Sequence, residues 1–287
     1  MNTKITPNPS IRGGLVDFIS NIKVIQQEGL KTAIIDADSI LFAVCVDKKQ
    51  DENQIAQYGD QTERTLEQVI DEFNTYFLKV LMDSGCIQYV AFLTNGSHRY
   101  SFYPEYKANR KKLDKPKYLS ELREYTINTL GFCQVKGYEA DDLVNMCRQQ
   151  LGENTLIVHT DKDLDQITGN HYNYKKPEFY NIDLIESDSN LWKQVLQGDF
   201  TDGIPGCKGI GISKANLCLH NADLKGDSYP GAALNKYIEV YKNTTKAIEE
   251  FSLTYKLIKL LDLGDSGLFF QPSNIEDKLD LEFNLNI

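Results

Sequence analysis

Short apolar runs alternate with longer helical patterns through the first two thirds of the chain. The runs 32–36, 88–93 and 155–159 are mainly apolar, and each has the length of a buried strand. Segment 63–83 places apolar residues three or four positions apart, which is typical of a helix, and we expect another helix at 118–130 and a short strand near 132–135. Strands that alternate with helices predict a mostly parallel α/β sheet flanked by helices.

The same patterns divide the chain into three parts. Apolar residues at helical spacing over 15–25 predict an amphipathic helix before the first strand. After about residue 185 the pattern is helical, with glycine-rich turns at 203–211 and apolar helices near 234–241 and 247–262. We therefore expect an N-terminal helical extension, an α/β domain and a helical region, at residues 1–30, 31–185 and 186–287.

The composition indicates a globular protein and argues against a membrane-spanning one. The 287 residues are 41% hydrophobic, enough for a sizeable core, and the longest apolar stretches fall well short of the roughly 20 residues that span a bilayer. The N-terminus lacks the apolar core of a signal peptide, so we expect a cytoplasmic protein with no membrane partner. Six cysteines with no Cys-x-x-Cys pair and no nearby His-x-x-x-His argue against a zinc site or a disulfide scaffold. A net charge of -10 argues against a nucleic-acid partner unless cations offset the acids locally.

Three acidic clusters carry the candidate chemistry. Hard divalent ions such as Mg2+ prefer oxygen ligands, so carboxylates gathered at the ends of strands and helices predict a site that processes phosphate esters. Each cluster alone also has a structural explanation, because acids are favoured in a first helical turn and an Asp-x-Asp pair can form an ordinary turn. The clusters are Glu139, Asp141 and Asp142; Asp161 and Asp163; and Asp199 and Asp202.

A basic segment follows the second predicted strand. Residues 106–117 contain six basic residues and one acid in twelve positions. Such a segment is often only a solvated face. Its functional interpretation is a positive strip over the metal site, with Lys107 and Arg110 aimed at a phosphate and Tyr106 stacked on a terminal base.

A glycine-rich turn at 206–214 leads into a predicted helix with Lys214 in its first turns. Glycines let another backbone or a phosphate approach closely, and the amides at a helix N-terminus bind phosphate. A dinucleotide-binding loop is the competing interpretation. It fits poorly because that fingerprint follows a strand, whereas Asp-Gly-Ile-Pro precedes these glycines.

Together these motifs resemble the 5'-nuclease family, which includes flap endonucleases, bacteriophage 5'-3' exonucleases and the 5'-nuclease domain of bacterial DNA polymerase one. The resemblance runs from about Ile34 to Leu219, with the motifs in one order. It rests on Glu-Ala-Asp-Asp at 139–142, Thr-Asp-Lys-Asp-Leu at 160–164, Gly-Asp-x-x-Asp-Gly-Ile-Pro-Gly at 198–206, Gly-Ile-Gly-Ile-Ser-Lys at 209–214 and Tyr-Lys-Ala-Asn-Arg at 106–110.

The resemblance implies a Rossmann-like (PIN-like) catalytic sheet, a helical arch at 95–117 and a helix-three-turn-helix at about 198–220 that grips duplex DNA with a monovalent cation such as K+. It also implies two ions of Mg2+ or Mn2+ and hydrolysis of phosphodiesters that leaves a 5'-phosphate. The expected partners are DNA 5' ends, flaps or nicks, RNA-DNA hybrids, and replication proteins. The expected setting is replication or repair by a monomer in a bacterial or phage-infected cell.

The family's functional residues transfer to this chain by position. The tighter metal site would be formed by Asp36, Glu139, Asp141 and Asp161. The second would be shaped by Asp142, Asp163, Asp199 and Asp202. The resemblance assigns transition-state stabilisation to Lys107 and Arg110, and the DNA contacts to Tyr106, Lys111, Lys112, Gly206, Gly209, Gly211 and Lys214.

The sequence departs from the family at one position. After the strand that ends at Leu93, family members usually place an aspartate that helps to hold the first metal, whereas this chain has Thr-Asn-Gly-Ser at 94–97. Asn95 offers a carbonyl without charge, and Asp38 is a candidate substitute. Two hypotheses follow: an active 5'-nuclease, or a structure-specific DNA-binding protein of the same fold with a weakened metal site. A PIN-like ribonuclease is disfavoured, because such enzymes generally lack the duplex grip at 206–214.

Overall fold

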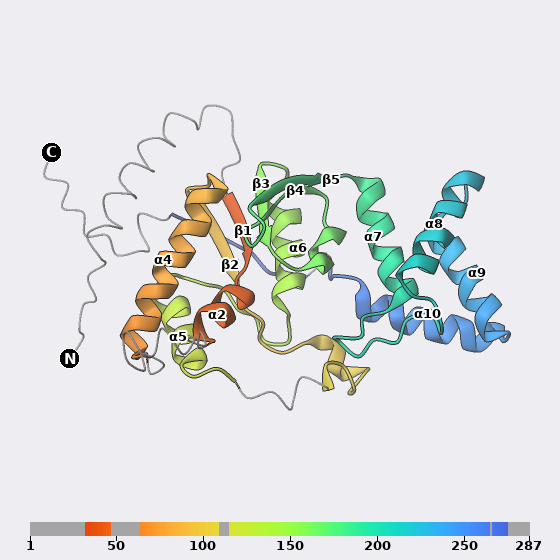
Figure 1. Ribbon diagram of the computed structural model, residues 1–287, viewed down its shortest axis with the longest axis horizontal. Helices are drawn as coiled ribbons and strands as arrows, with labels where there is room; N and C mark the ends of the chain where they lie inside the picture. Colours follow the sequence, from red (N-terminus) through yellow and green to blue (C-terminus); the bar gives the residue numbers. More distant parts are fainter. Residues whose placement is uncertain (1–31, 47–63, 109–114, 265, 275–287) are drawn as a thin grey trace, which may run out of the picture.

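The computed structural model describes residues 32–46, 64–108, 115–264 and 266–274 (Figure 1). The helix expected at 15–25, the predicted catalytic residue Arg110 and the predicted DNA contacts Lys111 and Lys112 lie outside these ranges. Within them, no helix combines the length and the apolar content that crossing a bilayer requires.

Among the described residues, a sheet of six strands in the order β5-β4-β3-β1-β2-β6 forms the centre of the fold. The four inner strands run parallel, while β5 and β6 pair antiparallel at the two edges. The predicted mostly parallel sheet is thereby confirmed. The strand expected near 132–135 is reduced to one bridge between Phe92 and Cys133. The strands are β1 (Thr32–Asp36), β2 (Gln88–Phe92), β3 (Thr155–His159), β4 (Gly169–Asn173), β5 (Glu178–Ile182) and β6 (Ser273–Asn274).

Helices cover both faces of the sheet. Successive side chains along a strand point to opposite faces, so apolar residues in a row need a helix to pack against on each face. Ala33 and Ile35 of β1 pack with α2, α4 and α5, whereas Ile34 packs with α6. Figure 1 shows α4 and α5 on one side of the sheet and α6 on the other. Burial on both sides explains why the strands are continuous apolar runs in the sequence. The helices are α2 (Asp38–Cys45), α4 (Leu66–Ser84), α5 (Leu119–Asn128) and α6 (Ala140–Leu151).

Four further helices form a helical region beyond α6 (Figure 1). At its centre, the ring of Phe251 lies 5.8 Å from that of Trp192 and 5.5 Å from that of Tyr237, measured between centroids. Tyr106, from the segment after β2, packs in the same hydrophobic cluster. The helices expected near 234–241 and 247–262 are present; the independence of this region from the α/β domain stays a prediction. The helices are α7 (Leu184–Gln197), α8 (Ile212–Lys225), α9 (Tyr229–Tyr241) and α10 (Thr244–Ile258).

Candidate active site

The parallel sheet brings carboxylates from distant parts of the sequence to one edge. β1 pairs with β3 so that Ile35 lies opposite Val158, and both strands therefore end at the same side of the sheet. Asp36 is the last residue of β1, and Asp161 follows β3 as the cap of the 3-10 helix η3 (Lys162–Gln166). Asp141 lies in the first turn of α6. Ligands of open α/β sheets bind at this carboxyl edge.

These carboxylates repel one another. Burial, followed by repulsion from neighbouring carboxylates, raises the pKa of Asp36 to about 7. The same causes raise the pKa of Asp163 to about 7 and that of Asp141 well above its usual range, with Asp161 among the repelling groups. Such clustering of raised carboxyl pKa values marks a place where a cation would replace protons.

The donor set fits a hard divalent cation. Within the described residues, Asp163 Oδ1 is buried and accepts no hydrogen bond. Asp161 Oδ1 accepts only a backbone bond of the η3 turn, from Asp163 N at 3.0 Å. The hollow of about 20 Å3 beside these groups is lined in part by Asp141, Asp163 and Asp202. Oxygen ligands and an orphaned carboxylate oxygen suit Mg2+ or Mn2+.

Lys107 lies against the acidic cluster. Its ammonium group forms an ion pair with Glu139 and lies 3.3 Å from Asp202 Oδ2. Burial opposes the lysine charge, but the carboxylates of Glu139 and Asp202 outweigh it and raise the pKa of Lys107. Lys107 N also donates to Asp202 O at 2.9 Å, and its φ of 53° holds it in the left-handed region. Both the side chain and the backbone amide of Lys107 therefore contact the acidic cluster.

Tyr106 does not offer its ring to a base in this structure. The residue is 3% exposed, and its hydroxyl lies 3.2 Å from the Glu139 carboxylate and 3.1 Å from Asp202 Oδ2. The prediction that Tyr106 stacks on a terminal base is therefore wrong, because the ring is packed into the helical region. Its hydroxyl instead contacts two predicted metal ligands.

Asp142 does not point into the carboxylate cluster. It is fully buried, and its two oxygens accept from Arg99 Nη1 and Nη2 at 2.7 and 3.1 Å and from Leu261 N at 3.0 Å. The predicted role of Asp142 at the second metal is therefore corrected: its charge is balanced by Arg99. Asp141, one position earlier on α6, instead lies close enough to Asp36 and Asp161 for both carboxylates to raise its pKa.

Arg99 is the site residue that sequence reasoning missed. It lies in the 3-10 helix η1 (His98–Ser101), is 3% exposed, and donates from Nη1 to Glu139 at 2.7 Å. Ser97 donates to the same Glu139 oxygen at 2.7 Å. Although burial opposes it, the combined effect of Lys107 and Arg99 lowers the pKa of Glu139. A single arginine among aromatic residues gives no periodic signal, so only the fold reveals its role.

Asp199 and Asp202 lie on a tight turn after α7. Asp199 Oδ1 accepts from Thr201 N and Asp202 N at 2.7 and 3.1 Å, and Asp199 Oδ2 lies 3.2 Å from Lys162 Nζ. A Cβ on Gly206 would lie 2.3 Å from Gly198 N. Gly206 is thus required by the close approach of its own chain, which brings Asp199 and Asp202 toward Asp163.

Gly209, Gly211 and Lys214 lie at the start of α8. Gly209 has a φ of 75°, which favours glycine, and Gly211 is the residue before the first turn of α8. Lys214 is exposed, and its Nζ donates to Gly209 O at 2.9 Å. These positions present backbone amides and a lysine to solvent, as the predicted phosphate contact requires.

Thr94 begins the segment 94–97, where the resemblance leads us to expect an aspartate. Its hydroxyl accepts from Ala140 N at 3.0 Å, which caps α6, and its amide donates to Asp38 Oδ2 at 2.8 Å. The other Asp38 oxygen accepts from Arg123 Nη1 at 2.7 Å. Asp38 therefore lies beside Asp36, whose pKa it helps to raise, but both of its carboxylate oxygens already accept hydrogen bonds, from Arg123 and from Thr94.

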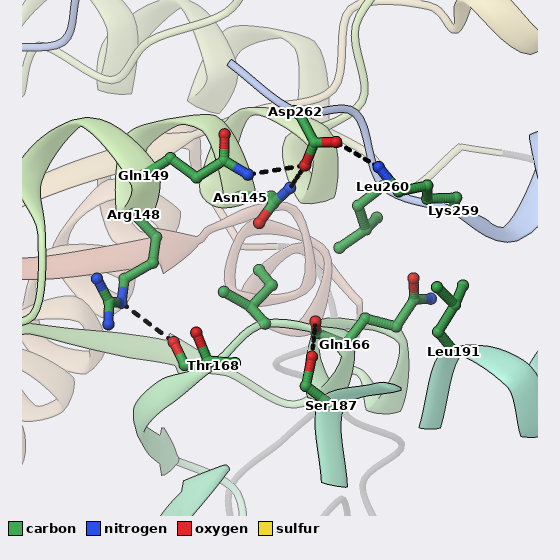
Figure 2. Close-up of a pocket in the computed structure, with 11 residues that line it drawn as sticks. Asn145, Arg148, Gln149, Gln166, Thr168, Ser187, Leu191, Lys259, Leu260 and Asp262 are labelled. Atoms are coloured by element: carbon green, nitrogen blue, oxygen red, sulfur yellow. Dashed lines mark hydrogen bonds and ion pairs between the residues drawn. The ribbon is translucent and has the colours of Figure 1, made fainter. Parts of the chain in front are cut away.

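Figure 2 shows a pocket of about 240 Å3 elsewhere on the molecule. Asn145 and Gln149 of α6 donate to Asp262 Oδ1 across its rim, and Arg148 Nε donates to Thr168 O at 3.1 Å. Among the described residues that line it, none is a predicted site residue. The bonds to Asp262 connect the chain after α10 to α6, and the bond to Thr168 connects α6 to the segment before β4.

Comparison with curated proteins links the chain to known nucleases. It is 31% identical over 172 residues to the thermostable DNA polymerase I of Thermus aquaticus, which covers 53% of this chain and 20% of the polymerase. It is 27% identical over 190 residues to the flap endonuclease Xni of Pseudoalteromonas translucida, covering 59% of this chain and 72% of Xni. The chain thus spans about a fifth of the polymerase and nearly three quarters of Xni.

Solved structures share the fold. The flap endonuclease D15 of bacteriophage T5, in a complex with DNA and metal ions, aligns with a TM-score of 0.59 at 15% identity over 80% of this chain and 89% of that chain. Human GEN1 in complex with Holliday junction DNA aligns with a TM-score of 0.51 at 15% identity over 92% and 70%. The model of the family described as "5'-3' exonuclease, N-terminal resolvase-like domain" matches residues 31–191, more than half of the chain. The chain therefore belongs to the 5'-3' exonuclease family.

Proposed function

We propose that this protein is a divalent-metal-dependent 5'-nuclease that acts on DNA 5' ends, flaps or nicks. The observation that carries the proposal is the convergence of Asp36, Asp141, Asp161 and Asp163 at one edge of the sheet. Their charge is balanced only in part by Lys107. Family membership and the similarity to the flap endonuclease Xni support the same reaction class.

The carboxylates divide into two groups by position. Asp36, Asp141 and Asp161 lie where one ion would be held, with Glu139 beside them once Lys107 releases it. Asp163, Asp199 and Asp202 lie together on the other side of the cluster and would serve a second ion. Bound Mg2+ or Mn2+ would supply Lewis acidity toward a phosphate and lower the pKa of an attacking water.

Lys107 is placed to form an ion pair with a phosphate of the substrate. Its ammonium group already lies in the cluster, opposite Glu139 and Asp202. A phosphodiester oxygen at that place would accept from the same ammonium group, which stabilises the charge that develops during hydrolysis. Arg110, three residues further on, is proposed to act with it.

The start of α8 is the proposed duplex contact. Gly209, Gly211 and Lys214 offer backbone amides and a cation that bind phosphates whatever the base sequence. A K+ ion at this turn, action on RNA-DNA hybrids, contact with replication proteins and a monomeric state complete the proposal.

One observation favours the second candidate, a DNA-binding protein with weakened catalysis. The resemblance leads us to expect an aspartate after the strand that ends at Leu93, where this chain has Thr-Asn-Gly-Ser at 94–97, and the Asp38 carboxylate already accepts from Arg123 and Thr94 N. The first ion would therefore be held by one carboxylate fewer than in the family.

Cleavage of a 5'-labelled flapped duplex tests the proposal. We expect short labelled products with Mg2+ or Mn2+ and none with EDTA. Asp141→Asn should abolish cleavage, whereas Asp71→Asn, on the exposed side of α4, should leave it unchanged. Tight flap binding without cleavage in either metal would establish the second candidate, and the absence of both binding and cleavage would reject the two together.

A further inference from the structure

A group of nitrogen and oxygen ligands lies next to the carboxylate cluster but is separate from it. His159 ends β3, Asp165 lies in η3 and His171 lies in β4. One ring nitrogen of each histidine and one carboxylate oxygen of Asp165 all lie within 4.8 Å of one another. The two histidines are 1% and 0% exposed, and Asp165 is partly buried.

Hydrogen bonds to backbone carbonyls fix the tautomer of each ring. His159 Nδ1 lies 2.7 Å from Asp161 O, and His171 Nε2 lies 2.8 Å from Ile167 O. A carbonyl oxygen only accepts, so both of these nitrogens carry the proton. In the neutral rings, His159 Nε2 and His171 Nδ1 are then both bare.

The two bare nitrogens face each other at 2.8 Å. Two lone pairs at that distance repel unless a cation lies between or beside them. Tyr180 does not resolve this conflict, because its hydroxyl has one proton and lies 2.8 Å from Asp165 Oδ1 as well as 3.1 Å from His159 Nε2. The group formed by His159, His171 and Asp165 therefore lacks one positive charge to separate the two facing lone pairs.

The missing charge is a proton or a metal ion, and two observations favour the metal. Both rings are almost completely buried, and burial disfavours a charged imidazolium. In addition, histidines that bind metals commonly donate their other N–H to a backbone carbonyl or a carboxylate, as both rings do here.

We propose that His159 Nε2, His171 Nδ1 and the Asp165 carboxylate bind one Zn2+ ion, with the Tyr180 hydroxyl or a water as the fourth ligand. Two imidazole ligands suit Zn2+ or Co2+ and not Mg2+. Nitrogens bound to a tetrahedral zinc lie about 3.3 Å apart, so the rings need to separate by roughly half an ångström.

Such an ion would brace the segment that carries Asp161 and Asp163. It would join the end of β3, the η3 turn and β4, and the ring of His159 would still hold the Asp161 carbonyl. The protein would then carry a structural ion with nitrogen ligands next to the catalytic ions with oxygen ligands.

Metal analysis of the full chain tests this site. Asp36→Asn/Asp141→Asn serves as the background, because it weakens competing zinc binding by the carboxylate cluster. After loading with Zn2+ and dialysis against excess Mg2+, we expect one zinc per chain. His171→Gln in this background should lose it, whereas His220→Gln, on the exposed face of α8, should retain it.

A second measurement covers the case in which His171→Gln does not fold. Co2+ in a tetrahedral site with nitrogen ligands absorbs visible light far more strongly than Co2+ among six oxygens. The background variant should show the intense bands, and Zn2+ but not Mg2+ should abolish them. No retained zinc together with no intense bands would overturn the proposal. Imidazole 15N shifts of a doubly protonated ring, with zinc present, would also overturn it and identify a trapped proton.

Discussion

Arg99 and Asp142 form a buried bidentate ion pair, in which the guanidinium donates to the two carboxylate oxygens at 2.7 and 3.1 Å. The same guanidinium donates to Glu139 at 2.7 Å. The orientation of Glu139, a predicted metal ligand, is therefore set by an arginine outside the cation cluster. Asp142 acts on the site through Arg99 and not through a metal.

Arg99→Met should lower the free energy of unfolding by about 3–5 kcal/mol, because it leaves two buried carboxylates without their counter-ion. Urea unfolding of the purified variant measures this. Lys79→Met is the matched control: it removes a cation from an exposed ion pair with Asp83, and we expect a loss of at most about 0.5 kcal/mol. Equal losses in the two variants would contradict the buried role of Arg99.

Stability without metal should fall as the pH rises from about 4 to 7. Asp36 and Asp163 titrate at about 7 in the folded chain and near 3.8 when unfolded, so over this interval the unfolded chain releases protons that the folded chain retains. Mg2+ replaces these protons and should raise the melting temperature by several degrees at pH 8 and far less at pH 5. Thermal melts in EDTA and in Mg2+, at matched ionic strength, measure it. An effect of Mg2+ that does not change with pH would argue against ion binding at these carboxylates.

Lys107→Met should lower the single-turnover cleavage rate by about 10²-fold or more, because it removes a cation from the developing charge. DNA affinity, measured by fluorescence anisotropy, should change much less. Lys107→Arg should recover part of the rate. If rate and affinity fall by the same factor, Lys107 is a binding residue and not a catalytic one.

Gly206→Ala should destabilise the chain far more than Gly209→Ala. Both glycines have positive φ, which alone costs about 1–2 kcal/mol for alanine. A Cβ at Gly206 would also lie 2.3 Å from Gly198 N, whereas no atom lies within 4 Å of one at Gly209. Urea unfolding distinguishes the two, and similar losses would show that the turn relaxes around the new methyl group.

Lys214→Ala should weaken duplex binding and reduce the slope of log K against log salt by about one phosphate contact. Titrations at several salt concentrations give the slope. Lys79→Ala, on α4, is the control and should leave the slope unchanged. An unchanged slope in Lys214→Ala would remove this lysine from the interface.

The sequence predicted the sheet well because its strands are encoded locally. The runs at 32–36 and 155–159 are strands with the same bounds in the structure, since burial on both faces demands continuous apolar residues. Strands β4 and β5, at one end of the sheet, were not predicted. Their sequences, Gly-Asn-His-Tyr-Asn and Glu-Phe-Tyr-Asn-Ile, are too polar to show that signal.

The sequence predicted the site residues that lie at the ends of strands. It did not predict the contacts that depend on packing between distant parts of the chain. Asp36 and Asp161 end or follow parallel strands, so their meeting follows from the topology. Tyr106 is buried against the helical region, for example in one cluster with Trp192, and Asp142 pairs with Arg99, 43 positions away in the chain; no local pattern encodes either contact. The lack of an aspartate at 94–97 was visible in the sequence, but the hydrogen bond from Ala140 N to the Thr94 hydroxyl was not.

The ion pair between Lys107 and Glu139 implies that metal and substrate are thermodynamically linked. In the metal-free protein each of these groups satisfies the other, and together they lie beside Asp202. A divalent ion bound by Glu139 would release the lysine, and a phosphate bound by the lysine would release Glu139. Once one ligand has broken the ion pair, the second ligand binds without the free-energy cost of breaking it. Such coupling is reciprocal. Mg2+ should therefore tighten the hold on DNA by the same factor by which DNA tightens the hold on Mg2+.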